Sequence, residues 1–208
     1  LYTFKYMFSL LQGLWKYLFQ KDEYFILIIG LDNAGKTTLF EQLKRKYCLT
    51  KYVGIPFEKI APTVGMNMGK IDLKTAVLVL WDLGGQDELQ SLWSKYFSDC
   101  HGIIYVIDSS DTHRFEESYK CFSSLILDEQ LKGVPLLVLS NKRDKANSVN
   151  SEAIKNIFNH SSHNIGRRDC MLHEVSALKG EGITEGIEWM LQCVKRNVIR
   201  PPKHEDII

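Results

Sequence analysis

The sequence predicts an α/β fold: a six-stranded, mostly parallel sheet with one antiparallel edge strand and helices on both faces. Two observations support this prediction. Short apolar runs alternate with segments whose apolar residues recur every three or four positions, which is the pattern of buried strands alternating with amphipathic helices. With 208 residues and 45% hydrophobic content, the chain is long enough for one such domain and an appendage.

Runs rich in branched aliphatic and aromatic residues are the expected strands. They cover residues 24–30, 65–73, 77–82, 102–108, 134–140 and 170–176. Because only a few residues around Lys74 and Thr75 join the second run to the third, these two should form an antiparallel hairpin at the sheet edge.

Helices are expected where apolar side chains share one face. Such faces are formed by Leu39, Leu43 and Tyr47, by Phe115, Tyr119, Phe122 and Ile126, and by Ile183, Ile187, Met190, Val194 and Val198. Pro201 and Pro202 should end the last helix and begin a polar tail over residues 201–208.

Charge and cysteine content argue against several classes of function. The net charge is +1 and the basic pairs are short and dispersed, so we expect solvated helix faces and no nucleic-acid-binding surface. The five cysteines are widely spaced and include no Cys-x-x-Cys pair. This pattern indicates neither a disulfide framework nor a zinc site, and it fits a reducing cytosol.

Residues 1–19 are apolar but predict neither a secretory signal nor a membrane span. Lys5, Gln12 and Lys16 interrupt the stretch, and polar residues follow it in place of a small-residue cleavage site. No glycine follows an initiator methionine and the chain shows no C-terminal cysteine, so we expect neither myristoylation nor prenylation.

The segment from Gly30 to Thr37 is the most informative motif. It follows an apolar run, and Gly30 and Gly35 let the backbone turn tightly with several N–H groups facing inward, where phosphate can bind. Lys36 is placed to reach the outer phosphates, and the Thr37 hydroxyl is placed to ligate Mg²⁺. The positive N-terminal end of the following helix points at the same anion. The motif therefore predicts a nucleotide site.

A second motif, Asn141-Lys-Arg-Asp144, selects the base. The Asp144 carboxylate can accept hydrogen bonds from the ring N–H and the exocyclic amine of guanine, a donor pair that adenine lacks on that edge. The Lys142 stem can lie over the base, and Asn141 can tie this loop to the phosphate loop. Alone, such a motif is also an ordinary polar turn, but its position after a strand and its distance from the phosphate loop favour GTP.

Three further segments are placed to complete the site. Asp82, at the end of a strand, can hold Mg²⁺ through water, and Gly85 offers an unobstructed N–H to the γ-phosphate. Gln86 can orient the attacking water, and the Thr63 hydroxyl can reach Mg²⁺ only when its loop closes on GTP. A backbone amide from the segment Ser176-Ala177-Leu178 can meet the guanine carbonyl oxygen. Each segment alone is also compatible with a simple turn or strand end.

Together these residues resemble the guanine-nucleotide switch proteins and, among them, the ADP-ribosylation factor family. The resemblance rests on Gly30-Leu-Asp-Asn-Ala-Gly-Lys-Thr-Thr38, Pro62-Thr-Val-Gly65 and Trp81-Asp-Leu-Gly-Gly-Gln-Asp87, and it spans nearly the whole chain. Residues 20–24, 88–93, 165–170, 186–190 and 196–202 are similar to a Golgi-associated branch. The resemblance implies a P-loop small G-protein fold over residues 21–200. It also implies that Asp32, Asn33, Ala34 and Thr38 contact the nucleotide.

The resemblance further implies a monomeric switch that cycles between GDP and GTP, with an exchange factor and a GTPase-activating protein supplied by other chains. Unaided hydrolysis should be slow, because an arginine supplied in trans is worth about 10³ to 10⁵ in rate in such systems. No arginine of the chain occupies a recognisable position for this role: Arg114 is the nearest candidate, and a surface helix position is the favoured interpretation for it. Asp32 stands where many related switches have glycine, and we expect it to crowd the site.

The N-terminal segment, residues 1–20, is the expected membrane element. Phe8, Leu11, Trp15 and Leu18 fall on one helical face. By resemblance, this helix packs on the domain with GDP and is evicted by a shift of residues 66–81 on GTP binding, so that residues 7–19 meet lipid. The resemblance aligns from Met7 onward, and residues 1–6 are therefore interpreted as an upstream extension.

The resemblance also implies an effector surface formed by Met66, Trp81 and Tyr96, with core packing as the alternative for Trp81. It implies a protein of the cytosol and, peripherally, of Golgi and trans-Golgi membranes, acting in vesicle trafficking. Two other functions stay open. A P-loop kinase or ATPase would need a different base loop, and a nucleotide-locked scaffold without turnover is disfavoured by Gln86.

Overall fold

The computed structural model describes residues 20–48, 52–158 and 162–202. The expected membrane helix, the extension over residues 1–6 and the end of the polar tail lie outside the described residues. Within the described ranges, no helix is long and apolar enough to cross a membrane.

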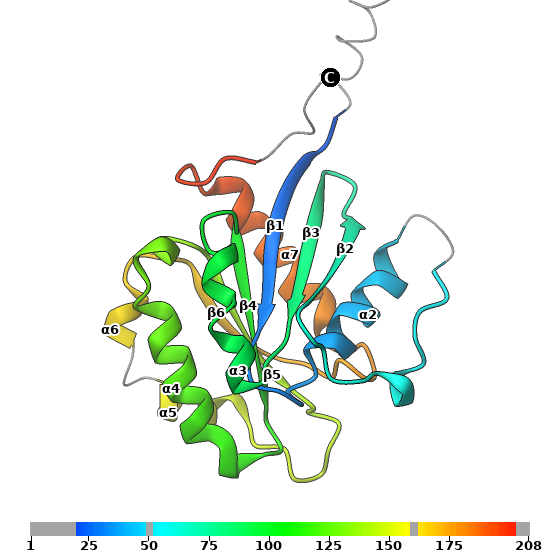
Figure 1. Cartoon of the computed structure of the whole chain (residues 1–208), viewed down its shortest axis with the longest axis vertical. Helices are drawn as coiled ribbons and strands as arrows, with labels where there is room; N and C mark the ends of the chain where they lie inside the picture. The colour runs from blue at the N-terminus through cyan, green and yellow to red at the C-terminus, as the bar shows by residue number, and fades with distance from the viewer. Residues whose placement is uncertain (1–19, 49–51, 159–161, 203–208) are drawn as a thin grey trace, which may run out of the picture.

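Six strands in the described part of the chain form one sheet in the order β2-β3-β1-β4-β5-β6 (Figure 1). They are β1 (Asp22–Ile29), β2 (Met66–Asp72), β3 (Ala76–Leu83), β4 (Gly102–Asp108), β5 (Leu136–Asn141) and β6 (Cys170–Glu174). β2 pairs with β3 in the antiparallel direction, and the other neighbours are parallel. The predicted sheet with its antiparallel edge hairpin is confirmed.

Helices cover both faces of this sheet. The longer ones are α2 (Lys36–Tyr47), α4 (Phe115–Ile126), α5 (Ser151–Phe158) and α7 (Ile183–Arg196). Figure 1 shows α2 and α7 on one face and α4 with α5 on the other. Short helices in the connections are α3 (Asp87–Gln90), α6 (Ser162–Ile165), η1 (Phe57–Lys59), η2 (Trp93–Tyr96), η3 (Thr112–Arg114) and η4 (Glu129–Leu131).

The core consists of two layers, one on each face of the sheet. Alternate residues of β1 enter different layers: Ile26 and Ile28 pack with α2 and α7, whereas Leu27 and Ile29 pack with α4. All four side chains are fully buried. Because both faces are covered, the central strands are continuously apolar, as expected for a parallel sheet.

Two features of the helices differ from the sequence-based expectation. The last helix ends at Arg196, and Val198 lies beyond it with 91% of its surface exposed, so Val198 does not belong to the buried face. The helix α5 was not predicted. Its apolar anchors Ile154 and Phe158 are buried four residues apart, and the Asn150 side chain accepts a hydrogen bond from the Ala153 N–H at the helix start.

Candidate functional site

The predicted site residues meet at one edge of the sheet, where the parallel strands end. The phosphate loop follows β1, Asp82 lies in β3, and Asn141 ends β5. Ligands of open α/β sheets bind at this edge. A cavity of about 200 Å³ lies there, lined by the phosphate loop, Thr63, Gly85, Gln86 and Lys142.

Two glycines of the phosphate loop have backbones that other residues would not tolerate. Gly30 has φ 139° and Gly35 has φ 94°. A Cβ on Gly30 would lie 2.3 Å from the Val106 carbonyl oxygen, and one on Gly35 would lie 2.3 Å from Asn141 Nδ2. These close approaches and positive φ angles explain why the loop needs glycine at both places.

Lys36 lies inside this loop and is 6% exposed. Its ammonium group donates to the Leu31 carbonyl oxygen at 2.7 Å and has no carboxylate within ion-pair distance in the described ranges. Burial lowers the pKa of Lys36 to about 8, against the opposing attraction of Asp82 and Asp32. A buried cation of this kind fits an anionic ligand such as a nucleotide phosphate.

Three predicted metal-site residues converge around one carboxylate. The Thr37 hydroxyl donates to Asp82 Oδ2 at 2.8 Å, and the Thr63 hydroxyl donates to the same oxygen at 3.3 Å. Asn67, which the sequence analysis did not single out, also donates to Asp82 Oδ2, at 3.0 Å. None of the motifs described in the sequence includes Asn67.

The other oxygen of Asp82 suits a hard cation. Asp82 is completely buried, and its Oδ1 has no hydrogen-bond partner among the described residues. Burial raises the pKa of this carboxyl, opposed in part by the hydrogen bonds from Asn67 and Thr37. A buried carboxylate oxygen without a partner, beside two hydroxyl groups, fits the oxygen ligands and bound waters that Mg²⁺ prefers.

The loop predicted to select the base is tied to the phosphate loop. Asn141 Nδ2 donates to the Ala34 carbonyl oxygen at 2.8 Å, and the Ser176 hydroxyl donates to Asp144 Oδ1 at 2.5 Å. The Lys142 ammonium pairs with Asp108 at 2.6 Å, which leaves its aliphatic stem beside Gly35. Arg143 is exposed.

Within the loop Ser176-Ala177-Leu178, the Ala177 amide is not free for a guanine contact. It donates to Asn141 Oδ1 at 2.9 Å and is therefore already used within the protein. The next amide, that of Leu178, has no acceptor in the described part of the chain and is the better candidate for the guanine carbonyl. The side chain of Asn141 thus joins three loops, a role that its sequence motif suggested only in part.

Arg114 is engaged by carboxylates. Its guanidinium pairs with Asp32 Oδ1 at 2.6 Å and with Glu117 Oε1 at 2.7 Å, and it also donates to the Asp32 carbonyl oxygen at 3.2 Å. The hydrogen bonds to Glu117 and Asp32 raise the pKa of Arg114. The ion pair with Arg114 holds Asp32 near the start of α4. Arg114 therefore stabilises the phosphate loop through Asp32.

The segment after Asp82 lies directly on the phosphate loop. The Gly85 carbonyl oxygen accepts from the Asp32 N–H at 3.2 Å, and the Gly84 N–H donates to the Gly65 carbonyl oxygen at 2.9 Å. A Cβ on Gly85 would lie 2.3 Å from Lys36 Nζ and 2.4 Å from the Gly30 carbonyl oxygen. Gln86 follows on an exposed position at the start of α3.

Comparison with known proteins decides the family. The sequence profile of the ADP-ribosylation factor family matches residues 10–194. The chain belongs to the ADP-ribosylation factor family. It is therefore a small GTPase, a GTP-binding switch that hydrolyses GTP, and its cofactors are guanine nucleotide and Mg²⁺.

Individual members of the ADP-ribosylation factor family are similar over almost the full chain. ADP-ribosylation factor-related protein 1 of Homo sapiens and that of Bos taurus are each 54% identical over 201 residues, which are 97% of this chain and 100% of the relative. ADP-ribosylation factor-like protein 3 of Saccharomyces cerevisiae is 45% identical over 198 residues, 94% of this chain and 98% of that protein.

A solved structure agrees with the fold. The Arl6 BBS3 small GTPase from Trypanosoma brucei, with the bound nucleotide analogue GppNp, superimposes with a TM-score of 0.72 and 27% identity. The match covers 84% of this chain and 99% of that chain. The predicted small G-protein fold and the predicted family are both confirmed.

Proposed function

We propose that this GTPase recruits effectors to Golgi and trans-Golgi membranes in its GTP-bound state and leaves the membrane for the cytosol in its GDP-bound state. The observation that carries the proposal is the contact of the Thr63 loop and Gly85 with the phosphate loop. Because the Thr63 loop and Gly85 both contact the phosphate loop, a third phosphate bound there would hold them in place, whereas GDP would not.

Each predicted site residue has a role in this proposal. The loop from Gly30 to Thr38, including Asp32, Asn33 and Ala34, wraps the phosphates, with Lys36 as the cation. Thr37 and Thr63 would hold Mg²⁺ directly and Asp82 would hold it through water. Bound Mg²⁺ neutralises phosphate charge. The base site consists of Asn141, Lys142, Asp144, Ser176 and the backbone around Ala177.

Hydrolysis depends on Gln86, which orients the attacking water. Its exposed position at the start of α3 is supported by no side-chain hydrogen bond among the described residues. Arg114 is held by Asp32 and Glu117 and does not stabilise the transferring phosphate. We therefore propose that unaided hydrolysis is slow and that a GTPase-activating protein supplies an arginine, worth about 10³ to 10⁵ in rate. An exchange factor from another chain releases GDP.

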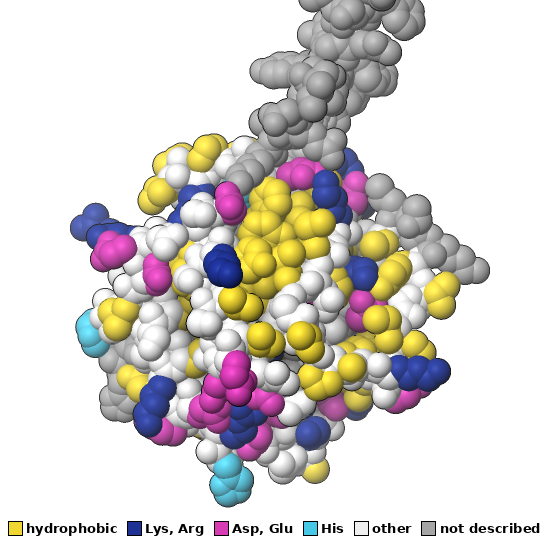
Figure 2. Space-filling view, in the orientation of Figure 1, with side chains coloured by type: hydrophobic (Ala, Val, Ile, Leu, Met, Phe, Trp, Pro, Cys, Tyr) yellow, Lys and Arg dark blue, Asp and Glu magenta, His cyan; other side chains and the backbone are white. Residues whose placement is uncertain are grey.

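The effector surface differs from the one expected from the sequence. Met66 is 37% exposed and Tyr96 is partly exposed, but Trp81 is only 9% exposed and packs against Phe25 and Tyr96. Met68, which faces Trp81 across the β2–β3 pair, is 61% exposed. Hydrophobic side chains gather over this part of the sheet in Figure 2. Met66, Met68 and Tyr96 are the proposed contacts, with Trp81 beneath them.

The proposed membrane binding is supported by the apolar helical face that the sequence predicts for residues 7–19 and by membership of the ADP-ribosylation factor family. Liposome flotation with GDP and with a non-hydrolysable GTP analogue tests it. We expect flotation only with the GTP analogue, and loss of flotation when residues 1–19 are removed.

A pair of substitutions separates lipid contact from general damage. Leu11→Asp places a carboxylate on the apolar face and should abolish flotation, whereas Ser9→Asp places the same charge on the polar face and should not. Flotation that is equal with both nucleotides would contradict the switch, and flotation that survives Leu11→Asp would contradict the membrane role of this helix.

A further inference from the structure

A buried tryptophan, Trp93, lies next to Gly84 and Gly85, the two glycines that follow β3. The indole Nε1 of Trp93 donates to the Gly84 carbonyl oxygen at 2.9 Å, and this hydrogen bond is buried. Trp93 begins η2 and is 4% exposed within the core layer that contains α4. An N–H donor held by core packing fixes its acceptor far better than a mobile surface side chain does.

The orientation of the Gly84 carbonyl determines the orientation of the Gly85 N–H. Both groups belong to one peptide unit, which is trans because the described residues include no cis peptide bond, so the two point in opposite directions. With the carbonyl directed at Trp93, the Gly85 N–H is directed away from the core. Gly85 itself lies against the phosphate loop, since an added Cβ would be 2.4 Å from the Gly30 carbonyl oxygen.

The Gly85 N–H is also unused. It donates to no acceptor within residues 20–48, 52–158 and 162–202, although Gly85 is buried. Buried N–H groups are nearly always paired, so a free one beside a phosphate loop is suited to an oxygen of the ligand.

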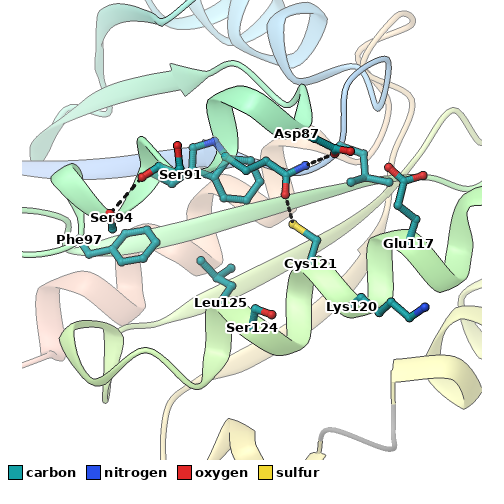
Figure 3. Close-up of a pocket in the computed structure, with 12 residues that line it drawn as sticks. Asp87, Ser91, Ser94, Phe97, Glu117, Lys120, Cys121, Ser124 and Leu125 are labelled. Carbon is teal, nitrogen blue, oxygen red and sulfur yellow. Dashed lines mark hydrogen bonds between the residues drawn. The ribbon is translucent and has the colours of Figure 1, made fainter.

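The next peptide unit is held by a second side chain. Gln90 Nε2 donates to the Gly85 carbonyl oxygen at 3.2 Å, and Gln90 Oε1 accepts from Cys121 of α4 at 3.3 Å. Figure 3 draws the hydrogen bond from Cys121 as a dashed line in the pocket between α3 and α4, with Cys121 and Leu125 projecting from α4. The pocket has a volume of about 410 Å³, and Trp93 forms part of its wall. Each carbonyl therefore has its own side-chain donor: Trp93 for Gly84 and Gln90 for Gly85.

We propose that Trp93 is a positioning residue for GTP recognition: its indole N–H fixes the Gly84–Gly85 peptide so that the Gly85 N–H faces the γ-phosphate. The proposal rests on the role proposed for Gly85. Without the indole donor, the Gly84 carbonyl loses its buried partner and the peptide is free to rotate. GTP binding should then weaken, whereas GDP binding, which lacks the γ-phosphate contact, should not.

The test is Trp93→Phe, which retains an aromatic ring and removes the donor. We expect the dissociation constant of a non-hydrolysable GTP analogue to rise about tenfold while that of GDP is unchanged, both measured by calorimetry. Trp189→Phe, at a partly buried tryptophan of α7, is the matched control and should change neither constant. Equal losses for both nucleotides, or no loss for either, would overturn the proposal.

Two further variants keep the test decisive. If Trp93→Phe does not fold, a tryptophan analogue with sulfur in place of the indole N–H can be incorporated at position 93, because it preserves the shape and deletes only the donor. Gly85→Ala should also weaken binding of the GTP analogue more than binding of GDP, because the added Cβ has no room. If Gly85→Ala leaves the relative affinity for the two nucleotides unchanged, the role proposed for Gly85 is wrong. If Gly85→Ala changes this relative affinity but Trp93→Phe does not, only the role proposed for Trp93 is wrong.

Discussion

The hydroxyl oxygen of Thr63 lies 2.9 Å from the hydroxyl oxygen of Thr37, although 26 positions separate the two residues. Thr37 lies in the first turn of α2 and Thr63 belongs to the loop before β2, so this contact closes that loop onto the phosphate loop. Both hydroxyls also reach the same oxygen of Asp82. The arrangement is the one expected for a metal site that GTP completes and GDP leaves open.

We predict that Thr37→Asn weakens Mg²⁺ and GTP binding together and leaves the protein in a GDP-like state. The hydroxyl ligand is lost, and an amide cannot reproduce its contact with Asp82 and Thr63. Affinity for a non-hydrolysable GTP analogue should fall at least about tenfold, measured by calorimetry at saturating and at low Mg²⁺. Thr37→Ser retains the hydroxyl and should behave as wild type. An unchanged GTP affinity in Thr37→Asn would contradict the assigned role.

Gln86→Leu should block stimulated hydrolysis and preserve GTP affinity. The leucine side chain cannot orient water, and position 86 is exposed, so the substitution leaves no buried cavity. Single-turnover measurements with an activating protein should show a loss of about 10² to 10³ in rate. Undiminished turnover under these conditions would remove Gln86 from the mechanism.

Asp144→Asn should change the base preference of the nucleotide site from guanine to xanthine. The carboxylate accepts from two guanine donors, whereas an amide can donate to the oxygen that xanthine has in place of the exocyclic amine. Competition binding should show GDP weakened by at least about tenfold and xanthosine diphosphate strengthened. Arg143→Gln changes the exposed neighbouring side chain and should leave base preference unaltered. A variant at Asp144 that binds both bases as wild type does would place base selection elsewhere.

Nucleotide affinity should fall as the pH rises above about 8. Burial lowers the pKa of Lys36 to about 8 in the protein without ligand, and a bound phosphate would raise it again. Above pH 8 the free protein has a neutral Lys36, so binding must take up a proton and affinity decreases with pH. Calorimetry of GDP binding at pH 8.5 in buffers of different ionisation enthalpy measures that uptake. Binding heats that are independent of the buffer would refute it.

Much of the architecture could be predicted because it follows from local patterns. The strand boundaries follow apolar runs, and the β2–β3 hairpin follows from a connection too short for a crossover. The phosphate loop could be found because two glycines and a lysine at fixed spacing have few other uses. The helix α5 was missed because it has only eight residues, of which just Ile154 and Phe158 are buried.

The supporting contacts of the site could not be predicted, since they join residues far apart in sequence. Arg114 reaches Asp32 across 82 positions, and nothing in either local pattern selects the partner. The burial of Trp81 depends on Phe25 and Tyr96, which come from other segments. The extent of the last helix was overestimated because Val198 continues the apolar spacing of α7 after the helix has ended.

The most direct test of the account is a calorimetric titration of the purified chain, with Mg²⁺ present, by GDP, by a non-hydrolysable GTP analogue and by ATP. The account predicts that both guanine nucleotides bind, that omission of Mg²⁺ weakens the GTP analogue, and that ATP does not compete. Absence of any guanine nucleotide binding, or displacement of GTP by ATP at comparable concentration, would contradict it.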